Sequence, residues 1–114
     1  PMYADLMLFH PSTSTEVKDR VKRDFAKSDP VIGFGTIITQ MQYSSADAQR
    51  LEQLDYKLYL VNSDGTPTNE TGLTDHCKKG FHIEPIAATG HYPMIEKPME
   101  FNRALENVLG EMLK

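Results

Sequence analysis

The sequence has only one cysteine, Cys77, so the chain cannot form an internal disulfide bond. A lone cysteine fits a reducing compartment, and we expect a cytoplasmic protein. No apolar run approaches the length that is needed to cross a bilayer. The N-terminus also lacks a basic region followed by a long apolar stretch, which is the pattern of a signal peptide. We therefore expect no membrane partner.

The chain also has fewer basic than acidic residues. The chain has 12 lysines and arginines against 16 acidic residues, which gives a formal net charge of −4. The tightest basic group, between Lys18 and Arg23, alternates with aspartates, a pattern that is typical of a solvated helix face. Because no basic stripe is present to neutralise phosphates, we do not expect nucleic acid as a partner.

The first half of the chain predicts mainly helices. Residues 2–9 are rich in apolar side chains and fit a short strand as well as a helix. The run TSTE at 13–16 matches a capping box, in which its first hydroxyl and its glutamate satisfy free amides at a helix start. Apolar side chains then recur every fourth residue, which predicts a helix over about 14–27. The members of this stripe are Val17, Val21 and Phe25.

Two further helices are predicted in this half. Asp29 can cap a helix over about 31–42, although that segment contains two glycines, each of which costs about 1 kcal/mol in a helix interior. The serine pair 44–45 can cap another helix over about 46–54. Short helices with polar joints suit a lid, so we assign residues 1–56 to a helical cap-like segment.

At Lys57 the pattern changes. The continuous apolar run at 58–61 is typical of a buried parallel strand, and a dense turn signal follows it. The expected order is a strand at 58–61, a helix over 68–79 closed by a left-handed Gly80, a strand at 81–86, a loop, and a helix over 98–113. The two strands should be parallel neighbours with a right-handed crossover. We therefore predict an α/β fold with parallel strands and assign residues 57–114 to a C-terminal α/β segment.

The clearest motif lies between the second strand and the last helix. It reads Gly90-His91-Tyr92-Pro93-Met94-Ile95-Glu96-Lys97-Pro98. This run resembles the catalytic-histidine loop of α/β-hydrolases, in which a G-H-x-P-x-x-E-x-P pattern leads into the last helix. The resemblance is specific over residues 57–113 and looser over 1–56. It implies a partial α/β-hydrolase architecture and hydrolysis of a small, partly apolar, ester-like substrate without a cofactor.

The resemblance also implies roles for individual residues. His91 would be the general base of a nucleophile–histidine–acid triad. Asp64 follows the strand at 58–61 and precedes His91, which matches the family's order, so it would orient the imidazole. The run around Asp64 departs from the glycine-then-acid spacing of many members. The pair Asp64-Gly65 also fits simple turn chemistry.

The family's nucleophile elbow, G-x-S-x-G, is missing from the sequence. The serines occupy capping or turn contexts instead: Ser12, Ser14, Ser28, Ser44, Ser45 and Ser63. Cys77 lies in a helical pattern and is expected to be buried. The nucleophile and the oxyanion-hole loop would therefore precede residue 1. Since hydrolysis needs both, we expect these residues to be inactive alone.

Two other functions remain open at this point. A two-stranded sheet has free edges that demand covering, so the chain could be a non-catalytic module that forms homo-oligomers or docks against the rest of a hydrolase sheet. Pro1 invites comparison with tautomerases, in which an N-terminal proline amine acts as a base. We expect no metal site, because His76 and His82 have poor spacing for metal ligands.

Overall fold

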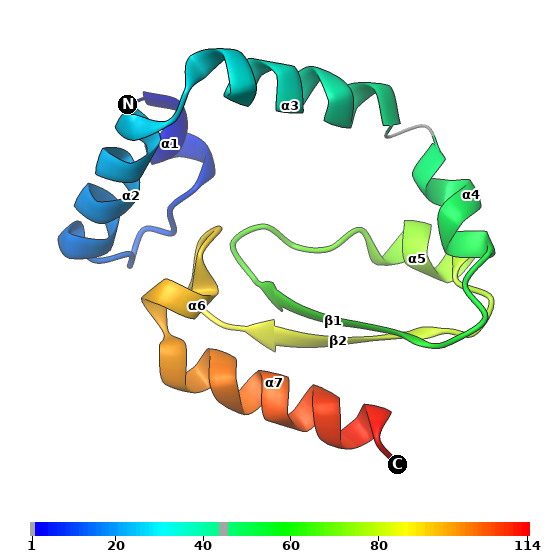
Figure 1. Ribbon diagram of the computed structural model, residues 1–114. Coiled ribbons are helices and arrows are strands. Elements are labelled where there is room, and N and C mark those ends of the chain that lie inside the picture. The colour runs from blue at the N-terminus through cyan, green and yellow to red at the C-terminus, as the bar shows by residue number, and fades with distance from the viewer. Residues whose placement is uncertain (1, 44–45) are drawn as a thin grey trace.

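The structure, a computed structural model, describes residues 2–43 and 46–114 and combines helices with a two-stranded parallel sheet (Figure 1). Pro1 and the expected capping serines at 44–45 lie outside the described residues. The helices are α1 (Met2–Met7), α2 (Thr15–Lys27), α3 (Pro30–Tyr43), α4 (Asp47–Glu52), α5 (Glu70–His76), α6 (Pro93–Glu96) and α7 (Pro98–Met112). The strands are β1 (Leu58–Ser63) and β2 (Phe81–Ile86). The mixed α/β character that the sequence predicts is confirmed.

The two strands are parallel, as predicted, with Leu58 opposite Phe81 at one end of the register. The amide of Leu58 donates to the carbonyl of Gly80 (3.1 Å). Leu58 and every second residue after it therefore direct their backbone amides and carbonyls toward β2. Tyr59 and Val61 consequently present their amides and carbonyls to the outer edge of β1. On β2 the outer edge includes Pro85, which has no amide hydrogen. The outer edge of β1 can therefore form a more complete hydrogen-bond ladder with another strand than the outer edge of β2 can.

The start of α2 differs from the predicted capping box. Ser14, not Thr13, is the N-cap, and its hydroxyl accepts a hydrogen bond from the amide of Val17 (3.3 Å). The Thr13 hydroxyl instead donates to Oε2 of Glu96 (2.7 Å), a residue 83 positions later in the chain. The capping-box prediction is wrong because the Thr13 oxygen accepts from the amide of His10 (3.0 Å) instead of from an amide of α2.

The other helices follow local signals closely. The segment 2–9, whose pattern left strand and helix open, contains the helix α1. Oδ1 of Asp29 accepts hydrogen bonds from the amides of Val31 (2.8 Å) and Ile32 (3.2 Å), which confirms its predicted capping role. The helix predicted over 68–79 is shorter, because Cys77 leaves the helical conformation (φ −85°, ψ 91°) and is buried. Gly80 then has the left-handed φ of 79° that we expected.

The buried core is small and divided. One cluster joins Leu8 and Val21, with partly buried side chains from Phe9, Val17 and Tyr92 packed around them. At the other end of the molecule, α7 packs on both strands and buries Ala104 and Val108. Tyr92 follows β2 in the chain, so the first cluster attaches the N-terminal helices to the loop after β2.

The helix α3 has no buried residue and arches over the rest of the chain (Figure 1). Its exposed apolar side chains are Val31, Ile32, Phe34, Ile37, Ile38 and Met41. The radius of gyration, 16.2 Å, exceeds the roughly 13 Å expected for a compact domain of this length. The accessible surface, 8529 Å², exceeds by about 2,200 Å² the area typical of a folded monomer of this mass. This chain therefore exposes surface that a closed domain would bury.

Across the described residues, no helix is both long and apolar enough to span a membrane.

Candidate histidine site

His91 lies in the loop that follows β2, at the carboxyl edge of the sheet, as the sequence predicts. Its ring is exposed and packs edge-on against the ring of Tyr92, with the two centroids 5.2 Å apart and the planes at 85°. Loops at this edge are where open α/β sheets place their functional groups. The exposed imidazole thus packs against a neighbouring ring.

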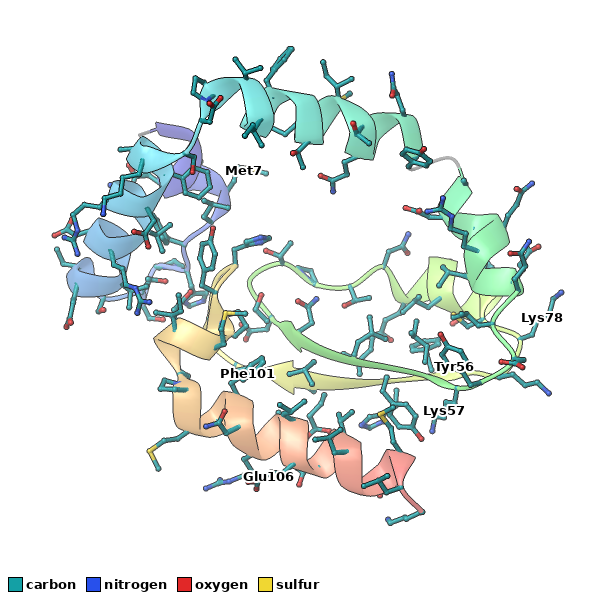
Figure 2. The ribbon with its side chains drawn as sticks, viewed as in Figure 1. Met7, Tyr56, Lys57, Lys78, Phe101 and Glu106 are labelled. Atoms are coloured by element: carbon teal, nitrogen blue, oxygen red, sulfur yellow. The ribbon has the colours of Figure 1, made fainter. Side chains whose placement is uncertain are left out.

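A cavity of about 410 Å³ borders His91. One wall is polar and is shaped by the amide of Asn62, which donates to the carbonyl of Thr66 (3.0 Å) and to the hydroxyl of Thr68 (2.8 Å). Another wall is apolar and includes Met94 and Phe101. Phe101 lies on α7 beside the carboxyl ends of the strands, whereas Tyr56 and Lys57 lie at the opposite end of the sheet (Figure 2). This cavity can receive a small molecule that is partly polar and partly apolar.

Asp64 contacts the backbone of the histidine loop. Its Oδ2 accepts a hydrogen bond from the amide of Ala88 (2.9 Å), and its Oδ1 is 3.4 Å from the amide of Thr89. The Ala88 hydrogen bond is the main reason that the pKa of Asp64 lies below its ordinary value of 3.8. Desolvation opposes this effect and raises the pKa, while the Thr89 hydrogen bond and the charge of His10 lower it further. Asp64 is therefore an anion at neutral pH.

The structure brings Asp64 and His91 to the same edge of the sheet, on the loops after neighbouring strands. Among the described residues, the hydrogen-bond partners of the Asp64 carboxylate are Ala88 and Thr89, not the ring of His91. Asp64 thus holds the loop from which His91 projects. A direct bond between the acid and the imidazole stays a prediction.

The backbone of the histidine loop is fixed by bonds from several directions. The carbonyl of Ala87 accepts from Nζ of Lys97 (2.8 Å), and the carbonyl of Ala88 accepts from the hydroxyl of Ser12 (3.1 Å). The side chain of Thr89 is fully buried and donates to the carbonyl of Ile86 (2.8 Å). Ala88 has a positive φ of 53°, which a non-glycine residue adopts only when its surroundings enforce it. The loop is therefore held in one conformation.

At two glycines, other backbone segments come closer to this loop than a side chain would allow. A Cβ atom on Gly90 would lie 2.4 Å from the carbonyl oxygen of Leu8, and one on Gly65 would lie 2.3 Å from that of Thr89. The amide of Gly65 donates to this same Thr89 oxygen (3.2 Å). The backbone that approaches Gly90 most closely is therefore the segment after α1.

That segment, Leu8–Thr13, is the part of the site that sequence reasoning missed. Next to Gly90, the carbonyl of Leu8 accepts from the amide of His91 (2.8 Å). Nδ1 of His10 lies 2.7 Å from the hydroxyl of Ser12 and accepts from the amide of Ser12 (3.1 Å). These residues follow an apolar stretch whose structure the pattern left open, and no periodicity links them to a loop so far away in the chain.

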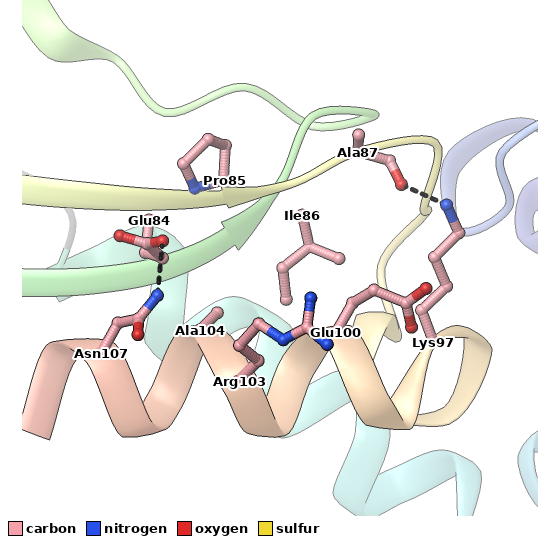
Figure 3. A pocket seen from close by; sticks show the side chains of 9 residues that line it. All are labelled: Glu84, Pro85, Ile86, Ala87, Lys97, Glu100, Arg103, Ala104 and Asn107. Carbon is pink, nitrogen blue, oxygen red and sulfur yellow. Dashed lines mark hydrogen bonds between the residues drawn. The ribbon is translucent and has the colours of Figure 1, made fainter.

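A second groove, of about 220 Å³, lies between β2 and α7 (Figure 3). Its bonded groups hold the structure together: Nζ of Lys97 donates to the carbonyl of Ala87 (2.8 Å), and the amide of Asn107 donates to Oε1 of Glu84 (3.4 Å). The groove contains neither His91 nor Asp64. It is separate from the candidate site.

Other sequence candidates have structural partners. Nδ1 of His76 is 2.8 Å from Oε1 of Glu52, which ties α5 to α4, and Nε2 of His82 is 3.0 Å from Oε2 of Glu84. Cys77 is buried, as expected. Within 2–43 and 46–114, no cluster of histidine, cysteine or acidic side chains could hold a metal ion.

Comparisons with known proteins found no matching family, no matching curated protein and no matching solved structure.

Proposed function

We propose that this chain is the C-terminal part of a cytoplasmic α/β-hydrolase that cleaves a small, partly apolar, ester-like substrate without a cofactor. The observation that carries the proposal is the position of His91. Its exposed imidazole projects from a tightly bonded loop at the carboxyl edge of a parallel sheet, beside a cavity with polar and apolar walls. A general base needs this combination of an exposed side chain, a fixed position and adjacent space for a substrate.

In the proposed reaction, a nucleophile from the preceding part of the protein attacks the ester carbonyl carbon while His91 takes its proton. His91 then gives this proton to the departing alcohol. In the second half, His91 removes a proton from water as the water oxygen attacks the acyl carbon. The bond between this carbon and the nucleophile then breaks, His91 returns the proton to the nucleophile, and the acid is released. Residues 1–56 form the helical cap-like segment and residues 57–114 the end of the hydrolase core. The chain alone is inactive because it lacks the nucleophile and the oxyanion donors.

Asp64 is the orienting acid in this proposal. Its lowered pKa keeps it ionised at neutral pH, so both of its carboxylate oxygens accept hydrogen bonds. A carboxylate can accept about four hydrogen bonds. Since the amides of Ala88 and Thr89 use only part of this capacity, Asp64 can also accept from a ring nitrogen of His91.

The large exposed surface also supports the proposal. The excess of about 2,200 Å² over a typical monomer is comparable in size to a permanent interface. The apolar side chains of α3 lie on this surface, and among the described residues β1 pairs with β2 alone. A hydrolase body that extends the sheet at β1 would cover both.

The test is hydrolysis of p-nitrophenyl butyrate by the protein that is translated from the complete reading frame containing this chain. We expect His91→Ala to lower kcat by about 10²–10⁴-fold, the usual contribution of a general base. His76→Ala is the matched control, because His76 bonds Glu52 away from the cavity, and it should keep kcat within about twofold. Full activity in His91→Ala would contradict the proposed role.

A second candidate is a non-catalytic module that associates with itself. Two observations favour it: α3 exposes apolar side chains, and among the described residues β1 pairs with only one other strand. Light scattering of the isolated chain at micromolar concentration is the test. A dimer or larger mass is expected, and a monomer mass would contradict this candidate.

A further inference from the structure

We infer that Glu96 is a positioning residue for His91, because its carboxylate ties the histidine loop to the N-terminal segment Leu8–Thr13. Oε1 of Glu96 accepts a hydrogen bond from the amide of Gly90 (3.0 Å), the residue directly before His91. Oε2 accepts from the hydroxyl of Thr13 (2.7 Å). The role of these two hydrogen bonds in catalysis rests on the proposed function. The two hydrogen bonds themselves do not depend on that proposal.

Glu96 completes a set of bonds to consecutive amides. Asp64 accepts from the amides of Ala88 and Thr89, Glu96 accepts from that of Gly90, and the carbonyl of Leu8 accepts from that of His91. Two carboxylates therefore hold the loop from different sides. Hydrogen bonds to a carboxylate are stronger than those between neutral groups, so these two acids contribute strongly to the placement of the loop.

Thr13, the second partner of Glu96, is also held by hydrogen bonds. Thr13 is buried, its hydroxyl accepts from the amide of His10 (3.0 Å), and its own amide donates to the carbonyl of His10 (2.9 Å). The Thr13 hydroxyl thus has a fixed direction and places its hydrogen on Glu96. Together with the bond from the His91 amide to Leu8, this contact holds Leu8–Thr13 against the loop at both ends of the segment.

The position of Glu96 is set by its own backbone. Its amide donates to the carbonyl of Tyr92 (3.0 Å), in the short helix α6 that begins at Pro93. The side chain is half-buried, so it is screened less by solvent than the exposed acids of α7 are. Removing the carboxylate would free the Gly90 amide and the Thr13 hydroxyl together. His91 would then lose its fixed position beside the cavity.

The test uses the 114-residue chain and nuclear magnetic resonance. Amide hydrogen exchange at Gly90 and His91 reports the loop, and long-range proton–nitrogen spectra report the tautomer of the His91 ring. We expect Glu96→Ala to speed exchange at both amides by roughly tenfold or more and to shift the ring signals. Glu96→Gln should restore the slow exchange, because its amide oxygen can accept from Gly90 and its amino group can donate to Thr13. Glu100→Ala, an exposed acid on α7, is the matched control and should change neither.

Exchange at Gly90 and His91 within about twofold of the original protein in Glu96→Ala, with unchanged ring signals, would overturn the inference. If Glu96→Ala fails to fold, as judged from the amide signals of α7, Thr13→Val decides instead. It keeps the shape of the side chain, removes the hydroxyl, and should speed exchange at both amides. No substrate is used, so a failure of ester hydrolysis would refute the proposed function without affecting this result.

Discussion

Replacing Gly90 with alanine should destabilise the chain, because Gly90 is where the histidine loop meets the N-terminal segment. A Cβ atom there would lie 2.4 Å from the oxygen of Leu8, 2.8 Å from the nitrogen of His10 and 2.9 Å from Cα of Phe9. All three separations fall well inside the optimal contact distance of about 3.5 Å. All three neighbours are backbone atoms, so no side chain can rotate out of the way. The two segments must move apart.

The expected magnitude follows from the contacts that this movement breaks. Overpacking a tight contact costs about 1–3 kcal/mol. Losing the bond between the His91 amide and the Leu8 carbonyl adds about 1 kcal/mol. Alanine restricts the unfolded chain, which offsets about 0.4–1 kcal/mol. The free energy of unfolding should therefore fall by about 1–3.6 kcal/mol.

Urea unfolding followed by circular dichroism measures this change, and the midpoint should fall by roughly 1 M. Gly110→Ala is the control, since a Cβ atom at Gly110 in α7 meets nothing within 4 Å. It should stabilise the chain by up to about 1 kcal/mol, through helix propensity. A Gly90→Ala variant within about 0.5 kcal/mol of the original protein, with unchanged hydrogen exchange at the His91 amide, would refute the reasoning.

Three further outcomes are expected. The folded-state pKa of Asp64 lies below its ordinary value of 3.8, so its stabilising contact with Ala88 is present at higher pH and is lost as the pH falls through that lowered pKa. The amide signal of Ala88 should report this loss below about pH 4, and a flat signal over that range would contradict it. Thr89→Val removes the buried hydroxyl that bonds Ile86 and should lower the free energy of unfolding by about 1 kcal/mol, whereas a urea midpoint equal to that of the original protein would show that this bond contributes nothing. Phe34→Lys on exposed α3 should leave the circular dichroism spectrum unchanged and lower the mass of any oligomer seen by light scattering, and an unchanged oligomer mass would exclude this face from the interface.

Local patterns predicted much of the fold. Apolar spacing indicated α2 and α7, and the change of period at Lys57 located the start of the sheet. The cap of α3 at Asp29 and the left-handed Gly80 were also predictable, because each depends on atoms within a few residues. The end of α5 was not, since the sequence pattern continues as a helix through Cys77, whereas Cys77 has a non-helical backbone.

The candidate site was predictable only in part. The motif around His91 indicated the loop, and strand order placed Asp64 at the same edge. The contacts of Ser12 and Thr13 were not predictable, because their partners lie 76 and 83 positions away. A threonine just before a helix predicts an N-cap. Only the folded chain shows that the hydroxyl of Thr13 donates to a carboxylate far away in the sequence.

The most direct test of the account is to read the coding DNA immediately upstream of the Pro1 codon. We expect the open reading frame to continue upstream and to encode a G-x-S-x-G elbow, which would supply the nucleophile for His91. An initiation codon directly before Pro1 would contradict the hydrolase proposal, because the chain would then have no nucleophile for its histidine to activate.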